Sequence, residues 1–462
     1  MQTAANHELP TRIAEPPLVP GFPVVGSVPE MIRLGLDFFV EKWRRYGDVY
    51  RVKAGTRNMV IIAHPDGVER VLGSNRDNYY KGHIYDDLRV LTGEGLLTLE
   101  QEPWRKRRRM AQPAFHKESI RNLTATMARI TGEKLDEWRR RLPEGGTVDM
   151  HREMVQLTLD VVGDALFGSR LEREDTDASG RAFGEALELL SQRSNAAVQW
   201  PAWVPTPGNV RLRRAIRLLD AMVYDIIARA RAGSSAAGTP TLLRMLIDAR
   251  DADTGEGLVD RELRDEMITL FLAGHETTAL LMSWGFTLLG REPPVVEKMR
   301  AEVREVLGQR VPTADDLPRL TYVRQVVDEI LRLRSPVWSL GRDVAEDDVV
   351  AGFRVRKGDI AMPMVYLTHR HPDFWQDPER FDPERFRPEQ VKARHHWAYY
   401  PFSLGPRMCI GNMFTLVEAQ IIWAMLLQRI DFELPPGPPV QAVTHMTLRP
   451  KGAVNVTFRW RS

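Results

Sequence analysis

The sequence predicts a mainly α-helical protein with small β regions near both ends of the chain. From about residue 115 to 335, nearly every segment carries apolar residues at helical spacing, interrupted only by short stretches rich in glycine and proline. Short segments that alternate or run apolar between turn residues are confined to residues 49–65, 348–365 and 440–460. No internal repeat and no low-complexity segment is present in the 462 residues.

The first elements follow a proline-rich entry at residues 16–28. The stretch "EMIRLGLDFFVEKWRRYG" carries apolar positions at helical spacing and predicts a helix that ends at Gly47. The next two stretches, "VYRVKAG" and "NMVIIAHP", predict the two strands of a β-hairpin.

Two further segments later in the chain predict helices. Residues 260–290 would span about 45 Å as one helix, and their apolar middle between charged flanks predicts a helix that crosses the interior. The stretch "TYVRQVVDEILRLRS" predicts a second helix closed by Pro336. It places Glu329 and Arg332 on one face, three residues apart.

The bulk composition excludes several classes of protein. With 64 basic and 62 acidic residues the charge is nearly balanced, which argues against general nucleic-acid binding. A single cysteine cannot form an internal disulfide. The N-terminus lacks a signal-peptide pattern and no run of about 20 apolar residues occurs, so we expect a soluble, cytoplasmic protein without a membrane anchor.

The one cysteine, Cys409, lies in the stretch "PFSLGPRMCIG" directly before a predicted helix. A helix N-terminus favours a thiolate. Gly405 and Gly411 allow a close approach to a flat ligand, and Arg407 suits a carboxylate on it. Zinc is a poor fit because no CxxC partner exists. A buried free thiol, a nucleophilic cysteine with a distant histidine, and a haem iron, which needs one proximal protein ligand, remain as alternatives.

The pattern Phe402-x-x-Gly405-x-Arg407-x-Cys409-x-Gly411 resembles the haem-binding signature of the cytochrome P450 family, in its soluble bacterial form. The other motifs resemble that family's in the expected order. They are tryptophan-x-x-x-arginine at Trp104 and Arg108, "AGHETT" at residues 273–278, Glu329-x-x-Arg332, and "FDPERF" with Arg385.

This resemblance implies a triangular helical prism with a smaller β-rich lobe, as one haem domain over residues 21–462 after a flexible, proline-rich segment at residues 1–20. The length alone would suggest about three domains, and the resemblance implies a single domain instead. It implies haem b as cofactor with Cys409 as the iron ligand. The remaining cofactor contacts that it implies are Trp104, Arg108, Arg342, Phe402, Arg407 and Gly411, and its structural triad is Glu329, Arg332 and Arg385.

"GHETTA" begins like the helical zinc motif HExxH, but Ala279 stands where the second histidine would be, which excludes that reading. Thr277 could simply bond back to a carbonyl of its own helix. The resemblance instead gives Glu276 and Thr277 the delivery of protons during oxygen activation. We expect His275 to be a packed or solvent-facing residue.

The resemblance implies a monooxygenase that inserts one oxygen atom from O2 into a C–H or C=C bond of a small hydrophobic substrate, such as a terpenoid, fatty acid, steroid or other secondary metabolite. The expected substrate-lining residues are Thr269, Leu272, Ala273, Val337 and Leu340, with a loop around residues 84–91. A peroxide-driven or isomerising haem-thiolate enzyme and a haem sensor are the alternatives.

No flavin or iron–sulfur motif is present, so electrons are expected from a separate ferredoxin or flavodoxin and its reductase. The basic run "RKRRR" at residues 105–109 is the candidate docking site for an acidic partner of this kind. A solvated helix face is the simpler interpretation of the same charges.

Overall fold

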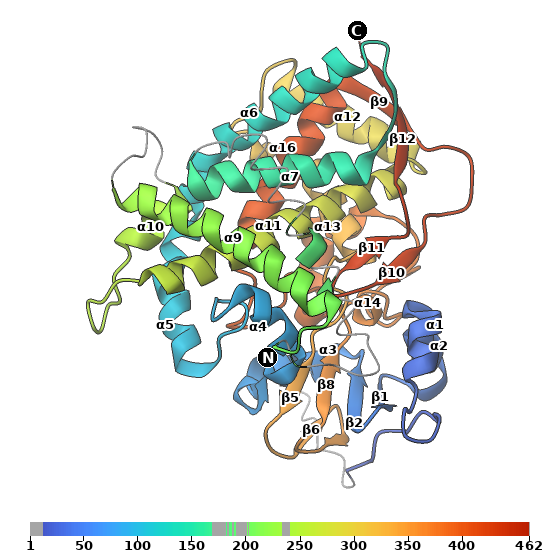
Figure 1. Cartoon of the computed structure of the whole chain (residues 1–462). Coiled ribbons are helices and arrows are strands. Elements are labelled where there is room, and N and C mark those ends of the chain that lie inside the picture. The colour runs from blue at the N-terminus through green and yellow to red at the C-terminus, as the bar shows by residue number, and fades with distance from the viewer. Residues whose placement is uncertain are drawn as a thin grey trace, which may run out of the picture. The chain divides into compact units, whose positions relative to one another are not determined.

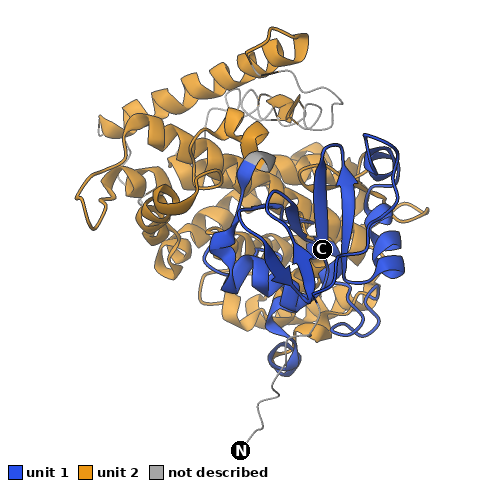
Figure 2. Ribbon diagram, turned by 90° about the horizontal axis from the view of Figure 1, so that it is seen from below, with its two compact units in different colours: residues 1–84, 337–380, 389–409 blue, residues 85–336, 381–388, 410–462 orange. Residues whose placement is uncertain are grey.

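The computed structural model describes residues 13–168, 203–232 and 241–461, with a few positions between 182 and 201. The chain forms two compact units, each assembled from separate stretches of sequence (Figure 2). Unit 1 comprises residues 1–84, 337–380 and 389–409, and unit 2 comprises residues 85–336, 381–388 and 410–462.

Unit 1 is built around a five-stranded sheet with the strand order β1-β2-β8-β5-β3. β1 and β2 form the predicted antiparallel hairpin, and β8 joins β2 in parallel. The strands are β1 (Val49–Ala54), β2 (Arg57–Ile62), β3 (Tyr79–Tyr80), β5 (Arg342–Val344) and β8 (Ile360–Pro363), with a separate pair β6 (Asp348–Val350) and β7 (Phe353–Val355). The helices are α1 (Val28–Leu34), α2 (Leu36–Tyr46), α3 (Pro65–Glu69), α14 (Val365–Thr368) and most of α15 (Pro388–Ala393).

The single helix predicted before Gly47 is divided into α1 and α2. Gly35 separates them with φ +55°, a backbone conformation that side chains other than glycine rarely adopt. The predicted end of the helix is confirmed, because Gly47 has φ +88° and its N–H bonds to the carbonyl of Trp43.

The proline-rich entry is anchored in unit 1 where the structure describes it. Val19 is buried and its N–H donates to the Arg51 carbonyl at 2.8 Å, while the Ala14 N–H donates to the Gly352 carbonyl at 3.2 Å. Residues 14–19 of the segment expected to be flexible therefore contact unit 1, and residues 1–12 lie outside the described residues.

Unit 2 is mainly helical, as predicted (Figure 1). Its helices include α4 (Asp86–Thr92), α5 (Gln101–Ala111), α6 (Lys117–Arg141), α7 (Met150–Phe167), α9 (Pro207–Arg231), α10 (Leu242–Asp248), α11 (Asp260–Leu289), α12 (Pro293–Leu307), α13 (Thr321–Leu333) and α16 (Asn412–Arg429). A three-stranded sheet has the order β4-β12-β9, and β10 pairs with β11. These strands are β4 (Gly146–Asp149), β9 (Ile430–Glu433), β10 (Ala442–Thr444), β11 (Leu448–Pro450) and β12 (Asn455–Trp460).

The long helix α11 lies in the core of unit 2, where it contacts α7, α9 and α16. Its C-terminal half is almost fully buried, and Gly285 lies so close to α16 that a Cβ atom there would be 2.5 Å from the Trp423 ring. The Trp284 indole N–H donates to the Leu448 carbonyl at 2.9 Å, which fixes β11 beside α11. None of the described helices is long and apolar enough to cross a membrane.

Candidate functional site

The loop that carries Cys409 is held by its own backbone. The Cys409 N–H donates to the Phe402 carbonyl at 2.9 Å and the Met408 N–H donates to the Gly405 carbonyl at 3.1 Å. Gly405 has φ +73°, and a Cβ atom there would lie 2.4 Å from the Leu72 carbonyl oxygen. Only glycine fits this turn, and the turn leaves the Cys409 thiol exposed.

An exposed cysteine is unusual, because cysteine is among the residue types most often buried. The donor set of the chain also fits haem, whose iron takes one thiolate from the protein, and the sequence supplies one cysteine. Three residues near Cys409 in the sequence are partly buried: Phe402, Arg407 and Gly411. Arg342 begins β5 with its side chain buried, and its guanidinium donates to the Gly341 carbonyl at 2.8 Å.

In unit 2, the middle of α11 has one accessible stretch. Ala273 is exposed, and Gly274 and Thr277 are partly exposed, although most of the surrounding helix is buried. Residues four apart share a helix face, so Ala273 and Thr277 lie on one accessible face. The Thr277 hydroxyl donates to the Ala273 carbonyl at 2.6 Å, the back-bond that a purely structural threonine would also make.

The Glu276 side chain contacts Arg449 of β11 and Thr447, the residue that directly precedes β11. Its Oε1 accepts hydrogen bonds from the Thr447 hydroxyl at 2.7 Å and from the Arg449 guanidinium, at 2.6 Å from Nη2 and 3.1 Å from Nε. Glu276 and Thr277 are adjacent in sequence, but their polar atoms have different partners. Sequence reasoning did not find Arg449.

His275 is packed rather than exposed. Its side chain is buried, and Nδ1 lies 2.7 Å from the Phe271 carbonyl oxygen. Burial lowers the pKa of His275, which keeps the ring neutral at neutral pH.

The predicted triad residues lie together in unit 2. The Arg332 guanidinium holds both oxygens of Glu329, at 2.7 and 2.8 Å, and both side chains are fully buried. Arg385 Nε lies 3.7 Å from Glu329 Oε1, which also accepts the Asp382 N–H at 2.8 Å. Burial raises the pKa of Glu329, and the hydrogen bonds from Arg332 oppose that rise.

Trp104 and Arg108 lie one turn apart on α5. Trp104 is 9% exposed and packs in a small apolar cluster with Leu96, Leu99 and Ile410. The Arg108 side chain is partly exposed, and its Nε donates to the side-chain amide oxygen Oε1 of Gln112 at 2.9 Å.

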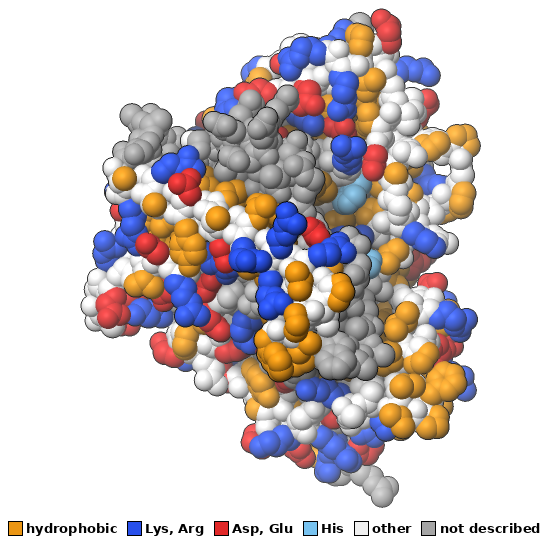
Figure 3. All heavy atoms as spheres, in the orientation of Figure 1, with side chains coloured by type: hydrophobic (Ala, Val, Ile, Leu, Met, Phe, Trp, Pro, Cys, Tyr) orange, Lys and Arg blue, Asp and Glu red, His pale blue; other side chains and the backbone are white. Residues whose placement is uncertain are grey.

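Two members of the basic run at residues 105–109 form ion pairs within unit 2. Arg107 is buried and pairs with Glu262 at 2.6 Å and Glu266 at 2.9 Å. Lys106 pairs with Glu256 at 2.9 Å. The proposed docking role is therefore wrong for Arg107, whose guanidinium is occupied inside the unit. Basic and acidic side chains are likewise interspersed on the face of the protein that Figure 3 shows.

The expected substrate-lining residues differ in accessibility. In unit 2, Thr269 and Leu272 are buried and Ala273 is exposed. In unit 1, Val337 is partly buried and Leu340 is 8% exposed in an apolar cluster. The loop expected around residues 84–91 is largely the helix α4, with Leu88 and Leu91 buried, because its apolar residues recur at helical spacing. The side chain of residue 84 lies outside the described residues.

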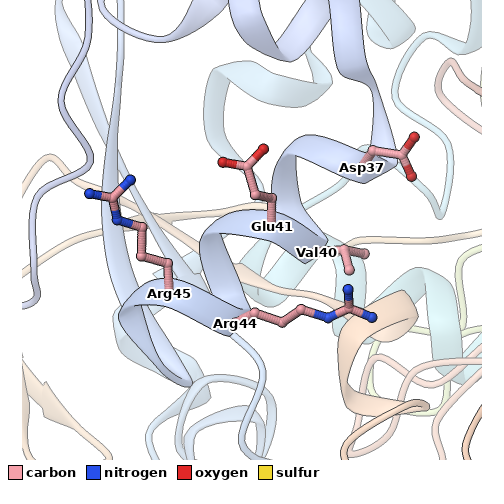
Figure 4. A pocket seen from close by; sticks show the side chains of 5 residues that line it. All are labelled: Asp37, Val40, Glu41, Arg44 and Arg45. Carbon is pink, nitrogen blue, oxygen red and sulfur yellow. The ribbon is translucent and has the colours of Figure 1, made fainter.

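A pocket on unit 1 is lined by five residues of α2 and contains no predicted site residue (Figure 4). The lining residues are Asp37, Val40, Glu41, Arg44 and Arg45. Charges of both signs on one exposed helix face are an ordinary solvated surface.

The exposed thiol on a tight loop and the accessible threonine on a long core helix suit the class of haem-thiolate oxygenases. The family model for cytochrome P450 matches residues 16–458. The chain belongs to the cytochrome P450 family, which uses a haem-thiolate cofactor, and it is a cytochrome P450 monooxygenase.

Similar proteins extend over nearly the whole chain. The cytochrome P450 132 of Mycobacterium bovis is 34% identical over 450 residues, which cover 94% of this chain and 95% of that protein. The cyclooctat-9-en-7-ol 5-monooxygenase of Streptomyces melanosporofaciens is 32% identical over 438 residues, 93% of each chain. The crystal structure of the cytochrome P450DA heme domain matches with a TM-score of 0.89 and 28% identity over 98% of both chains.

Proposed function

We propose that this monooxygenase inserts one oxygen atom from O2 into a C–H or C=C bond of a small hydrophobic substrate. A terpenoid is the first candidate for this substrate. The accessible face of α11 carries the proposal. It presents the Ala273 methyl group, to which an apolar substrate can bind, and the Thr277 hydroxyl on the same face. A relative at 32% identity is named for the oxidation of cyclooctat-9-en-7-ol, a lipophilic alcohol.

Cys409 holds the haem in this proposal, because the family requires a thiolate and the chain has no other cysteine. The hydrogen-bond donors for the haem carboxylates are Trp104, Arg108, Arg342 and Arg407. The iron ligand Cys409 is flanked in sequence by Phe402 and Gly411. The bound haem supplies the activation of oxygen, and its thiolate ligand favours cleavage of the O–O bond. The Glu329–Arg332–Arg385 triad stabilises the fold and takes no part in the chemistry.

Thr277 holds a proton on Oγ1 and passes it toward the reacting oxygen, and Glu276 replaces that proton through water. In the structure the Thr277 proton points to the Ala273 carbonyl. Rotation of one hydroxyl is therefore enough to redirect the proton toward the accessible side of the helix.

Electrons come from a separate ferredoxin or flavodoxin with its reductase. Since Arg107 is buried, the exposed members of the basic run are the ones that an acidic partner can reach. Neutralising Lys106 should slow electron transfer and weaken its dependence on salt. Unchanged rates at all salt concentrations would contradict this docking site.

The central experiment compares Thr277→Ala with Thr277→Ser, using the lipophilic compound from a panel that most shifts the iron spin state. With NAD(P)H, ferredoxin and reductase, T277A should lower product formed per NAD(P)H by about tenfold or more, a modest part of what general acid catalysis contributes, and T277S should retain most of it. Product formation with hydrogen peroxide alone, and none with NAD(P)H, would instead favour a peroxide-driven enzyme. A panel without any spin shift, or an unaffected T277A, would contradict the proposal.

A further inference from the structure

The contacts of Glu276 converge on one of its two oxygens. Oε1 accepts from Thr447 Oγ1 and from both Nε and Nη2 of Arg449, at 2.6–3.1 Å. The described residues give Oε2 no hydrogen bond. The Glu276 side chain is 12% exposed and that of Arg449 is 35% exposed, so this ion pair is more protected from solvent than an ordinary surface pair.

Arg449 is itself held in place by the strand β11. On one side of it, the Leu448 carbonyl accepts the Trp284 indole N–H at 2.9 Å, and the Leu448 N–H donates to the Pro336 carbonyl at 2.8 Å. Arg449 also pairs through the backbone with Val443 of β10. β11 lies beside α11 (Figure 1). Because the backbone of Arg449 is held in this strand, its guanidinium can orient the Glu276 side chain.

Other ionisable groups near this pair do not compete with it. His151 and His275 both feel the charges of Glu276 and Arg449, and burial lowers the pKa of each ring. The His151 ring is turned to Ser283, with Nδ1 3.0 Å from the hydroxyl. Among the residues that the structure describes, Arg449 is therefore the cation that contacts Glu276.

We propose that Arg449, with Thr447, is the positioning residue of the proton-delivering acid Glu276. The guanidinium fixes Oε1 in one place and leaves Oε2 to exchange protons with the water that serves Thr277. The inference rests on the proposed function and adds a residue to its machinery. It also makes proton delivery dependent on the position of the β10–β11 hairpin, 173 residues away from Glu276 in sequence.

The test uses the haem-loaded protein and two readouts. The first is product formed per NAD(P)H with the best-bound panel compound. The second does not depend on turnover: the carboxylate stretching bands of Glu276, obtained as the infrared difference between wild type and Glu276→Gln. Arg449→Met removes the cation and keeps much of the side-chain volume, and Arg449→Lys keeps the charge.

The expected result is a loss of coupling by about threefold to tenfold in R449M, a fraction of what a misplacement of about 1 Å can cost. R449K should recover part of the loss, and the Glu276 bands should shift in R449M. In the E276Q background, R449M should cause no further loss of coupling, because Arg449 acts through Glu276.

Arg129→Met is the matched control. Arg129 pairs with Asp164 at 2.7 Å with side-chain exposures of 46% and 16%, close to those of the Arg449–Glu276 pair. It should leave coupling and the Glu276 bands unchanged.

A lower melting temperature of R449M with unchanged coupling and unchanged bands would overturn the inference and assign Arg449 a structural role. The failure is distinguishable from that of the proposed function. If T277A uncouples the reaction and R449M does not, only the role of Arg449 is wrong. If T277A remains coupled, the proton-delivery proposal itself fails.

Discussion

The buried ion pair of α13 offers a prediction that can be worked out from its geometry. Glu329 and Arg332 are both fully buried and joined by two hydrogen bonds of 2.7 and 2.8 Å. Arg332→Met would leave the Glu329 carboxylate buried with only the Asp382 N–H at 2.8 Å and the more distant Arg385 guanidinium at 3.7 Å. An uncompensated buried charge of this kind should lower the free energy of unfolding by about 3–5 kcal/mol.

The same helix provides a control. Arg324 pairs with Asp328 at 2.9 Å, but its side chain is 39% exposed. Because solvent already screens this pair, Arg324→Met should cost only about 0.3–0.5 kcal/mol. Urea unfolding followed by circular dichroism, with the midpoint shift multiplied by the shared m value, gives both numbers.

A third variant separates the charge from the packing. Replacing both Glu329 and Arg332 by methionine removes the buried charges together, so the double variant should recover at least half of the R332M loss. Equal costs for R332M and R324M, within about 0.5 kcal/mol, would refute the reasoning. So would a double variant less stable than R332M.

Two further predictions concern the cysteine loop and the core. Gly405→Ala should strongly reduce haem-thiolate ligation, measured from the absorption spectrum, because its methyl group would lie 2.4 Å from the Leu72 carbonyl oxygen at φ +73°; a normal spectrum would contradict this. Burial raises the pKa of Glu418 from 4.5 to about 8, so the folded protein binds its proton more tightly than the unfolded chain. The free energy of unfolding should therefore fall by about 3–5 kcal/mol as the pH rises from about 5 to 8. Glu418→Gln should remove that part of the pH dependence, and parallel pH curves for the two proteins would contradict it.

Local sequence patterns were sufficient for the elements that depend on local spacing. The helix at residues 260–290 is present as α11, because its caps and apolar middle are contained in one stretch of sequence. The Glu329–Arg332 contact follows from their i,i+3 spacing. The turn at Gly405 follows from the conformational freedom of glycine.

Contacts between distant segments could not be predicted in the same way. The charges at residues 105–109 predict a docking surface, but Arg107 pairs with Glu262 and Glu266, which lie 155 and 159 residues further along the chain. The contact between Arg449 and Glu276 could not be predicted for the same reason, because nothing in the stretch "TLRPK" indicates Glu276 as a partner. Both cases depend on which helix or strand the fold brings alongside, and spacing within a single stretch does not contain that information.

Ligation of the haem iron by Cys409 is the central requirement of the proposed function. The purified protein, reduced with dithionite and exposed to carbon monoxide, should give the strongly red-shifted Soret maximum of thiolate-ligated haem, and Cys409→His should lose it. A carbon monoxide complex without the red shift in the wild-type protein, or a red shift that persists in C409H, would contradict the assignment.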